Sequence, residues 1–427
     1  MEHDNIANKA LQEQWKKLIL GPLLEVKDTS IPSPLLLIID ALDEYDNDDD
    51  IRLVLKLLSS LEVQAIKSTK LRIFITSRQD TPIRLGFRDM PAILHRDLVL
   101  DDVARPVVDG DLRAYFNSEF GLIRKRNSDY SKQLDTWPGD DIISLLVSRS
   151  EGLFIYAATL CRFLQCDDDT QEPIERLSEL LDDKSTREID AHGNAQAHPL
   201  ELDKMYTQIL NHQLKRVTLA REQRKLKSVI GPLATLFEPL STGALGALLS
   251  LEEKKVSARL RGLRSVFNLP EDKTHAVRFL HTSFRDFLCD EKRCPAAFFV
   301  EARKEHGSIA RMCLKLMSKL LKKNICGVQE LGDVSKEDKF KLVSQHIPFE
   351  LQYACRYWVQ HLCKCNDIHH LASEDGIVEV FLREHLLHWL EALSWMDKAA
   401  EGVTAIISLE DAVKVSLHIF YILCKRF

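Results

Sequence analysis

The sequence predicts an α/β region at the N-terminus, followed by a winged helix and an all-α C-terminal domain, in a mostly helical chain. Two short apolar runs, residues 35–39 and 71–75, each end in polar residues and are separated by an amphipathic stretch. From about residue 107 onward, apolar positions follow helical spacing almost without interruption. Gly and Pro are sparse, at 16 and 14 of 427 residues, which disfavours a chain rich in β-turns.

Composition and charge exclude several classes of protein. The chain is 45% hydrophobic and 29% charged, which is typical of a globular protein, and its net charge of −6 gives no overall basic surface. Ten cysteines without a regular framework, and no signal peptide before them, predict reduced thiols in a cytoplasmic protein. No apolar run approaches the roughly 20 residues that span a bilayer, so no membrane partner is expected.

The N-terminal elements follow from the pattern of apolar residues. Residues 8–24 predict an amphipathic helix, and the apolar run 35–40 predicts a strand buried on both faces. An acidic turn then leads into a helix over residues 51–61. Residues 71–76 predict a second strand and residues 92–100 a third. Strand, helix and strand at this spacing predict a right-handed βαβ unit with parallel strands.

The rest of the chain is predicted to be helical except for one short hairpin. Helices are expected at residues 141–164, with a break at Gly152, and throughout residues 301–425. Residues 166–200 are acidic and polar, with a weak helix, and are interpreted as a linker. Residues 222–292 carry three helices and a hairpin, the order of a winged helix.

These predictions divide the chain into four parts. The expected domains are a partial nucleotidase core with a parallel P-loop-type sheet, a helical lid with its linker, a winged-helix domain and a helical C-terminal domain, at residues 1–105, 106–200, 201–300 and 301–427.

Three carboxylates follow the first predicted strand, namely Asp40, Asp43 and Glu44. Open α/β sheets bind their ligands at this end of the strands. Asp40 could hold Mg²⁺ through water, and Glu44 could orient or deprotonate an attacking water. Arg78 follows the second strand, where a guanidinium could contact a γ-phosphate. The alternative is a solvated acidic turn beside an ordinary loop arginine.

His281 ends a predicted strand and begins a helix whose buried face carries Phe284, Phe287 and Leu288. A ring N–H at this position could donate to a phosphate. The alternative is a histidine that caps the helix or is satisfied within the core.

Two further groups of residues have a suitable chemistry but a weak pattern. One segment carries side chains of the kinds that bind Zn²⁺, namely His361, Cys363, Cys365, His369 and His370. Their spacing fits no standard zinc site, so we expect them to be cysteines packed in helices and histidines on the surface. The third helix of the 222–292 segment carries the basic residues Lys254, Lys255, Arg259, Arg261 and Arg264. They could contact DNA, but we expect them to form a solvated helix face. Nucleic acid is therefore not the expected partner.

Residues 35–44, together with residues 75–78, resemble the Walker B and sensor segments of NACHT domains, which belong to the STAND class of signalling NTPases. The likeness is closer to fungal NACHT proteins with a nephrocystin 3-like nucleotide-binding segment. Further matching blocks lie at residues 14–23, 151–159, 279–288, 351–359 and 385–393.

The resemblance implies a switch between an ADP-bound closed form and an ATP-bound oligomer. Such proteins act in signal transduction of the innate-immunity or heterokaryon-incompatibility type. By this likeness Asp40 would be the Mg²⁺ ligand, and Glu44 and Asp43 the catalytic acids of the ancestral site. Arg78 and His281 would contact the phosphates of ATP or ADP.

The sequence also departs from the family. The Walker A loop would lie upstream of residue 8, and the pair Gly327 and Gly332 is followed by Asp333 rather than Lys-Ser/Thr. Without that lysine, nucleotide binding should be weak. We therefore expect a truncated NACHT-type signalling or regulatory protein, or a gene fragment, with no ATP hydrolysis of its own.

The expected partners are proteins, including full-length relatives of this chain. Two alternatives remain open at this stage. One is a composite nucleotide-binding NTPase whose P-loop comes from a partner, and the other is a winged-helix DNA binder.

Overall fold

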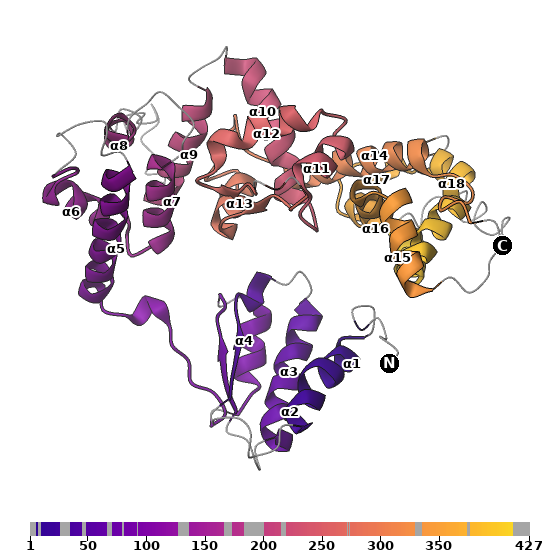
Figure 1. Ribbon diagram of the computed structural model, residues 1–427, viewed down its shortest axis with the longest axis horizontal. Helices are drawn as coiled ribbons and strands as arrows, with labels where there is room; N and C mark the ends of the chain where they lie inside the picture. The colour runs from indigo at the N-terminus through magenta and orange to yellow at the C-terminus, as the bar shows by residue number, and fades with distance from the viewer. Residues whose placement is uncertain are drawn as a thin grey trace. The chain divides into compact units, whose positions relative to one another are not determined.

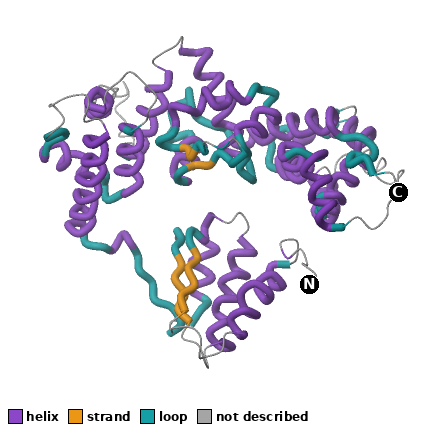
Figure 2. Tube along the Cα trace, viewed as in Figure 1, coloured by secondary structure: helices purple, strands orange, loops and turns teal. Residues whose placement is uncertain are grey.

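The computed structural model describes residues 6, 10–25, 35–44, 48–65, 71–78, 81–91, 93–126, 136–165, 173–182, 200–214, 219–270, 272, 274–328, 335–373 and 376–412. The chain divides into two compact units, Met1–Val103 (unit 1) and Ala104–Phe427 (unit 2). The described residues are mostly helical, and unit 1 contains a small parallel sheet, as predicted (Figures 1 and 2). The four-part division of the chain stays a prediction.

Unit 1 begins with a helical run and continues as a βαβ unit. Its elements are α1 (Leu11–Trp15), the π-helix η2 (Lys16–Leu20), α2 (Gly21–Glu25), β1 (Leu35–Ile39), the 3-10 helix η3 (Leu42–Glu44), α3 (Asp48–Ala65), β2 (Leu71–Ile75), α4 (Thr81–Arg88) and the 3-10 helix η4 (Leu100–Asp102). The first turn of α3 contains Asp48, Asp49 and Asp50. Their negative charges interact favourably with the positive end of the helix dipole. The predicted order of strand, helix and strand is therefore confirmed.

Strands β1 and β2 pair in parallel, with Leu35 opposite Leu71 and Ile39 opposite Ile75. Alternate side chains of the sheet, such as Leu37 and Ile73, pack on a small core of helix residues; that core consists of Leu42, Ile51, Leu55, Leu58 and Ile83. Helices α3 and α4 supply most of it, and they pack against each other.

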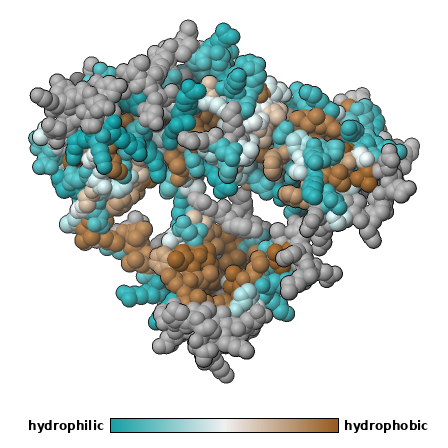
Figure 3. Space-filling model, viewed as in Figure 1, coloured by the Kyte–Doolittle hydropathy of each residue, from teal (hydrophilic) through white to brown (hydrophobic). Residues whose placement is uncertain are grey.

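The prediction that the first strand is buried on both faces is wrong. Leu36 and Ile38 of β1 and Phe74 of β2 are 56%, 60% and 53% exposed. In the described part of unit 1, the helix residues of the core cover only the face that carries Leu37 and Ile73, so the other face stays open despite its apolar side chains. Figure 3 shows a broad apolar surface over this unit.

The predicted third strand is also wrong. Residues 93–100, the described part of that segment, form a turn, a loop and the first residue of η4, and Ile93 and Leu98 are 93% and 78% exposed. The backbone closes on itself, because the Leu94 N–H donates to the Pro91 carbonyl at 2.9 Å. Among the described residues, Ile93 and Leu98 belong to no apolar core that would support a strand, so the local turns prevail.

The described residues of unit 2 are helical apart from one short hairpin and an isolated β-bridge between Ser241 and Ala276. Its N-terminal half contains α5 (Arg105–Arg126), α6 (Asp140–Arg149), α7 (Phe154–Leu164), α8 (Pro173–Leu181), α9 (Glu201–Leu214), α10 (Leu219–Thr235), α11 (Thr242–Leu248), α12 (Glu253–Leu260) and the 3-10 helix η6 (Arg261–Leu263). The predicted break at Gly152 is confirmed, since this residue has φ +85° between α6 and α7.

The C-terminal half of unit 2 begins with the hairpin. Its elements are β3 (Phe267–Asn268), β4 (Arg278–Phe279), α13 (Thr282–Cys289), α14 (Ala302–Leu320), α15 (Lys336–His346), α16 (Phe349–Cys363), α17 (Ile368–Leu371), α18 (Ile377–Trp395) and α19 (Ala399–Ala412). β3 and β4 pair antiparallel. One continuous apolar core runs from α5 to α19, and its largest fully buried side chains include Trp358 and Trp389.

Candidate functional site

The ends of β1 and β2 are joined by backbone hydrogen bonds. The Thr76 N–H donates to the Ile39 carbonyl at 2.9 Å, and the Leu42 N–H donates to the Thr76 carbonyl at 3.0 Å. Because the strands are parallel, both carboxyl ends lie at one edge of the sheet. The polar residues that follow each strand are therefore brought together there.

Thr76 connects the two loops through its side chain. Its hydroxyl donates to the Asp40 carboxylate and accepts the Ala41 N–H at 2.8 Å. Ala41 has φ +52°, an uncommon conformation for a residue with a side chain, and the Thr76 contact holds this turn. The sequence analysis did not identify Thr76 as a site residue. Its only signal there was a hydroxyl directly after the second strand.

Asp43 and Arg78 form the second contact between the loops. The Arg78 N–H donates to Asp43 Oδ1 at 3.0 Å, and the Arg78 Nε lies 3.5 Å from Asp43 Oδ2. The Asp43 side chain is 9% exposed, whereas that of Arg78 is 43% exposed. Both oxygens of Asp43 are thus engaged by Arg78, so this carboxylate serves the loop structure.

Asp40 is the more accessible of the two aspartates. Its exposed carboxylate contacts Thr76 through Oδ1, and an exposed carboxylate suits Mg²⁺, which usually binds through one or two carboxylates, waters and substrate phosphates. Glu44 ends η3, and its side chain lies outside the described part of the structure. Among the described residues, no group of three or more His, Cys, Asp and Glu could hold a metal ion.

His281 lies in unit 2, at the N-cap of α13. Its Nδ1 accepts the Ser283 N–H at 3.1 Å and lies 2.7 Å from the Ser283 hydroxyl, which in turn lies 2.8 Å from the Tyr206 hydroxyl. The capping alternative is therefore what the structure shows for Nδ1. With Nδ1 as an acceptor, the neutral ring carries its proton on Nε2.

The zinc-type residues do not assemble into a ligand set. His361 is fully buried, with Nδ1 at 2.7 Å from His306 Nδ1 and Nε2 at 2.7 Å from the Tyr353 hydroxyl. The Tyr353 hydroxyl also accepts the Phe237 N–H at 3.2 Å. Both ring nitrogens of His361 are thus engaged within the core, and the residue is unsuited to bind a metal.

Burial lowers the pKa of both histidines of this pair. The pKa of His306 is lowered to about 4 by desolvation, with a smaller contribution from the charge of Lys364. The pKa of His361 is lowered further, again mainly by burial. Both rings are therefore neutral at physiological pH.

The basic residues near α12 are dispersed. Arg261 lies in η6 and Arg264 follows it, both exposed, while Arg259 of α12 donates to the Ser228 hydroxyl of α10 at 3.1 Å. Lys255 pairs with Glu252 at 2.9 Å. The arrangement favours the solvated face over a DNA-reading helix.

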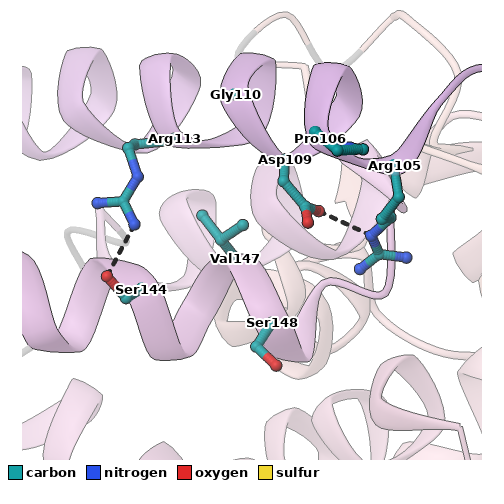
Figure 4. Close-up of a pocket in the computed structure, with 8 residues that line it drawn as sticks. All are labelled: Arg105, Pro106, Asp109, Gly110, Arg113, Ser144, Val147 and Ser148. Atoms are coloured by element: carbon teal, nitrogen blue, oxygen red, sulfur yellow. Dashed lines mark hydrogen bonds and ion pairs between the residues drawn. The ribbon is translucent and has the colours of Figure 1, made fainter.

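A cavity of about 490 Å³ lies between α5 and α6 in unit 2. The sequence analysis did not predict it, because its walls come from two helices that meet only in the fold. Figure 4 shows its lining residues, which are Arg105, Pro106, Asp109, Gly110, Arg113, Ser144, Val147 and Ser148.

Residues 1–78 match the protein family described as Nephrocystin 3, N-terminal. The matched range contains every strand-end residue described above, from Asp40 to Arg78. The vegetative incompatibility protein HET-E-1 of Podospora anserina is 23% identical to this chain over 426 residues. These matches confirm the resemblance to fungal NACHT-like proteins.

The similarity to HET-E-1 covers 92% of this chain but only 28% of the relative, so the chain spans less than a third of the length of HET-E-1. No solved structure gives a significant match. Within the described residues, every helix is too short or too polar to cross a membrane.

Proposed function

We propose that this NACHT-like chain is a signalling or regulatory protein that acts through protein contacts and does not hydrolyse ATP by itself. Similarity to a vegetative incompatibility protein supports a role in signalling. The single observation that carries the catalytic part of the proposal is the engagement of the strand-end carboxylates by Thr76 and Arg78. In these contacts, the carboxylates of Asp40 and Asp43 hold the loops after β1 and β2 together.

The resemblance gives each strand-end residue an ancestral role. Asp40 would hold Mg²⁺, Glu44 and Asp43 would act on the attacking water, and Arg78 would contact the phosphates of ATP or ADP. Residues 1–427 contain no Gly-x-x-x-x-Gly-Lys-Ser/Thr loop, the motif whose lysine contacts the β- and γ-phosphates. Nucleotide affinity from the remaining residues is therefore weak.

His281 would be the phosphate contact of the winged helix in the closed form. The order of α10, α11, α12 and the β3–β4 hairpin, followed by His281 at the start of α13, supports a winged helix in this part of unit 2. The Nδ1 cap on Ser283 fixes the ring and assigns the proton to Nε2, the nitrogen that would donate to a phosphate.

Protein contacts are supported by the open face of the sheet in unit 1. Leu36, Ile38 and Phe74 form neighbouring exposed positions there, since Ile38 pairs with Phe74 across the two strands. Contiguous exposed apolar side chains are typical of surfaces that bind other proteins. Full-length relatives, which share the segments of this chain, are the partners that we propose.

Phosphate release from Mg·ATP by the purified chain tests the catalytic part of this proposal. We expect no turnover above buffer, and no difference between the wild type and Glu44→Gln. Hydrolysis that Glu44→Gln abolishes would overturn it.

A composite NTPase is the second candidate, and the exposed carboxylate of Asp40 favours it. Adding a purified fragment of a relative that carries a P-loop should then produce turnover that depends on Asp40. If the fragment produces no ATP hydrolysis, the hypothesis of a composite NTPase is wrong.

The interaction part of the proposal has a separate test. A full-length relative should retain this chain in a pull-down with purified proteins, and Ile38→Lys should reduce retention. Exposed Arg52→Ala in α3 is the matched control. Equal retention of Ile38→Lys and wild type would contradict a role for the sheet face.

A further inference from the structure

The cavity between α5 and α6, called here the α5–α6 groove, brings two arginine side chains to one polar depression in unit 2. Arg105 and Arg113 both come from α5, and Ser144 of α6 contacts Arg113, while Ser148 of α6 also lines the depression (Figure 4). The two arginines are eight positions apart, so they lie about 12 Å apart along the helix axis. Pro106 and Val147 form an apolar part of the groove wall.

Arg113 has the simplest environment of the two arginines. Its Nη2 donates to the Ser144 hydroxyl at 2.7 Å, and that hydroxyl donates to the Asp140 carbonyl at 2.8 Å. Among the described residues, Arg113 has no carboxylate within ion-pair distance. Its positive charge is therefore presented to the groove through a guanidinium that a neutral hydroxyl holds in place.

Arg105 is partly neutralised. Its Nε donates to Asp109 Oδ1 at 2.8 Å, one turn along the same helix. The guanidinium has further N–H groups, and Nη1 lies near Gly152, where a Cβ would come within 3.2 Å of it. The groove thus carries two cations and one anion among its lining residues, with the uncompensated charge at the Arg113 end.

Gly110 keeps the middle of the groove open. It lies between the two arginines on α5 and lines the cavity, and a Cβ added there would meet nothing within 4 Å. A larger side chain could therefore enter the groove without a clash with the backbone. This position offers a way to fill the cavity while the helix stays intact.

We propose that the α5–α6 groove binds a small organic phosphate, with the phosphate at Arg113 and Ser144 and the organic part along Val147 and Pro106. The Arg113 guanidinium has N–H groups besides the one that the Ser144 hydroxyl accepts, and these can donate several hydrogen bonds to the oxygens of a phosphate. A volume of about 490 Å³ is within the range of small-molecule sites. The site is independent of the strand-end carboxylates of unit 1 and needs no magnesium.

Calorimetric titration of the full chain with phenyl phosphate, in EDTA, tests the proposal. We expect saturable binding that Arg113→Ala weakens by about tenfold or more, as loss of a charge-assisted contact predicts. Arg126→Ala, at the exposed end of the same helix, should leave the affinity unchanged. Benzoate replaces the phosphate of the probe by a carboxylate, and inorganic phosphate lacks the organic part. Both should bind more weakly than phenyl phosphate.

Two further variants keep the test independent of folding defects. Asp109→Asn removes the negative charge of the groove and should raise the affinity several-fold, an effect that a misfolded protein would not show. Gly110→Leu should abolish binding, whereas Gly121→Leu on the same helix should not. Absence of saturable binding by the wild type, weaker binding by Asp109→Asn, or equal losses in Arg113→Ala and Arg126→Ala would overturn the proposal.

Discussion

Polar residues are arranged differently in the two units of this protein. At the strand ends of unit 1, Thr76 binds Asp40 and Arg78 binds Asp43 at an accessible edge of a two-stranded sheet. In unit 2, His306, His361 and Tyr353 form a network enclosed by apolar side chains. The comparison teaches that hydrogen-bonded polar groups hold the structure in both units, and that burial decides how much stability is lost when one of them is removed. The predictions below test this difference, from the largest expected effect to the smallest.

Trp358→Ala should have the largest effect on stability. Trp358 is fully buried and lies edge-on against Phe381 and Trp389, with ring centroids 5.5 Å apart in both cases. The cavity left behind should lower the free energy of unfolding of unit 2 by about 4 kcal/mol. Urea unfolding followed by tryptophan fluorescence measures it. Leu36→Ala, on the open sheet face, should change stability by less than about 0.5 kcal/mol.

Arg293→Ala should have the next largest effect, because it leaves a buried carboxylate unpaired. Arg293 donates from Nε and Nη2 to the two oxygens of Asp203, at 3.0 and 2.7 Å, and the Asp203 side chain is 3% exposed. We expect a loss of about 3 kcal/mol in a chemical denaturation curve. The exposed pair of Arg52 and Asp49 in unit 1 is the counterpart, and Arg52→Ala should cost less than about 0.5 kcal/mol. Equal losses would remove the distinction between the units.

The histidine pair makes unit 2 sensitive to acid. The pKa of His306 in the folded protein, about 4, is below the ordinary value of about 6.5, so the unfolded chain binds protons more readily. Its contribution to stability is complete above pH 6.5 and is lost as the pH falls toward 4. Between pH 7 and pH 5 we expect a loss of about 1–2 kcal/mol.

Denaturant midpoints measured from pH 7 to pH 5 give the slope of stability against pH. His306→Asn should flatten it, whereas His369→Asn should not, because His369 is exposed. A wild-type midpoint that does not change from pH 7 to pH 5 would rule out neutral buried rings.

Thr76→Val should loosen the strand ends of unit 1. The substitution keeps the shape of the side chain but removes the hydroxyl between Asp40 and the Ala41 N–H. We expect a loss of about 1 kcal/mol, seen as faster hydrogen exchange of the Ala41 and Leu42 amides. Ser77→Ala, which removes a contact only to the neighbouring Arg78 carbonyl, is the control. Unchanged exchange in Thr76→Val would show that the hydroxyl does not hold this turn.

Ile38→Thr should have the smallest effect. Its side chain is 60% exposed and faces away from the core of unit 1, so the free energy of unfolding should change by less than about 0.5 kcal/mol. Ile51→Thr, at a position 2% exposed, should cost several times more in the same denaturation assay. A large loss from Ile38→Thr would mean that the outer sheet face is covered in solution.

The sequence predicted the elements whose signal is local. The βαβ order of β1, α3 and β2, the break at Gly152 and the position of His281 at the start of α13 follow from apolar spacing and from residues next to one another. The prediction of a third strand was wrong because composition is also a local signal. Residues 93–100 have a suitable composition, but among the described residues they pair with no other strand.

Features that depend on distant residues could not be predicted. Thr76 reaches Asp40 only because the register places Ile39 beside Ile75. His306 and His361 are 55 positions apart, and Arg113 and Ser144 are 31 positions apart. Each pair is set by how helices pack, which the pattern of one segment does not contain.

The central claim is that the strand-end residues of unit 1 hold their own loops and do not bind Mg·ATP tightly. Equilibrium dialysis of Mg·ATP against the purified chain tests it most directly. We predict that the wild type and Asp40→Asn retain the nucleotide equally weakly. Tight retention by the wild type that Asp40→Asn and Arg78→Ala abolish, and that Arg52→Ala leaves intact, would contradict the account.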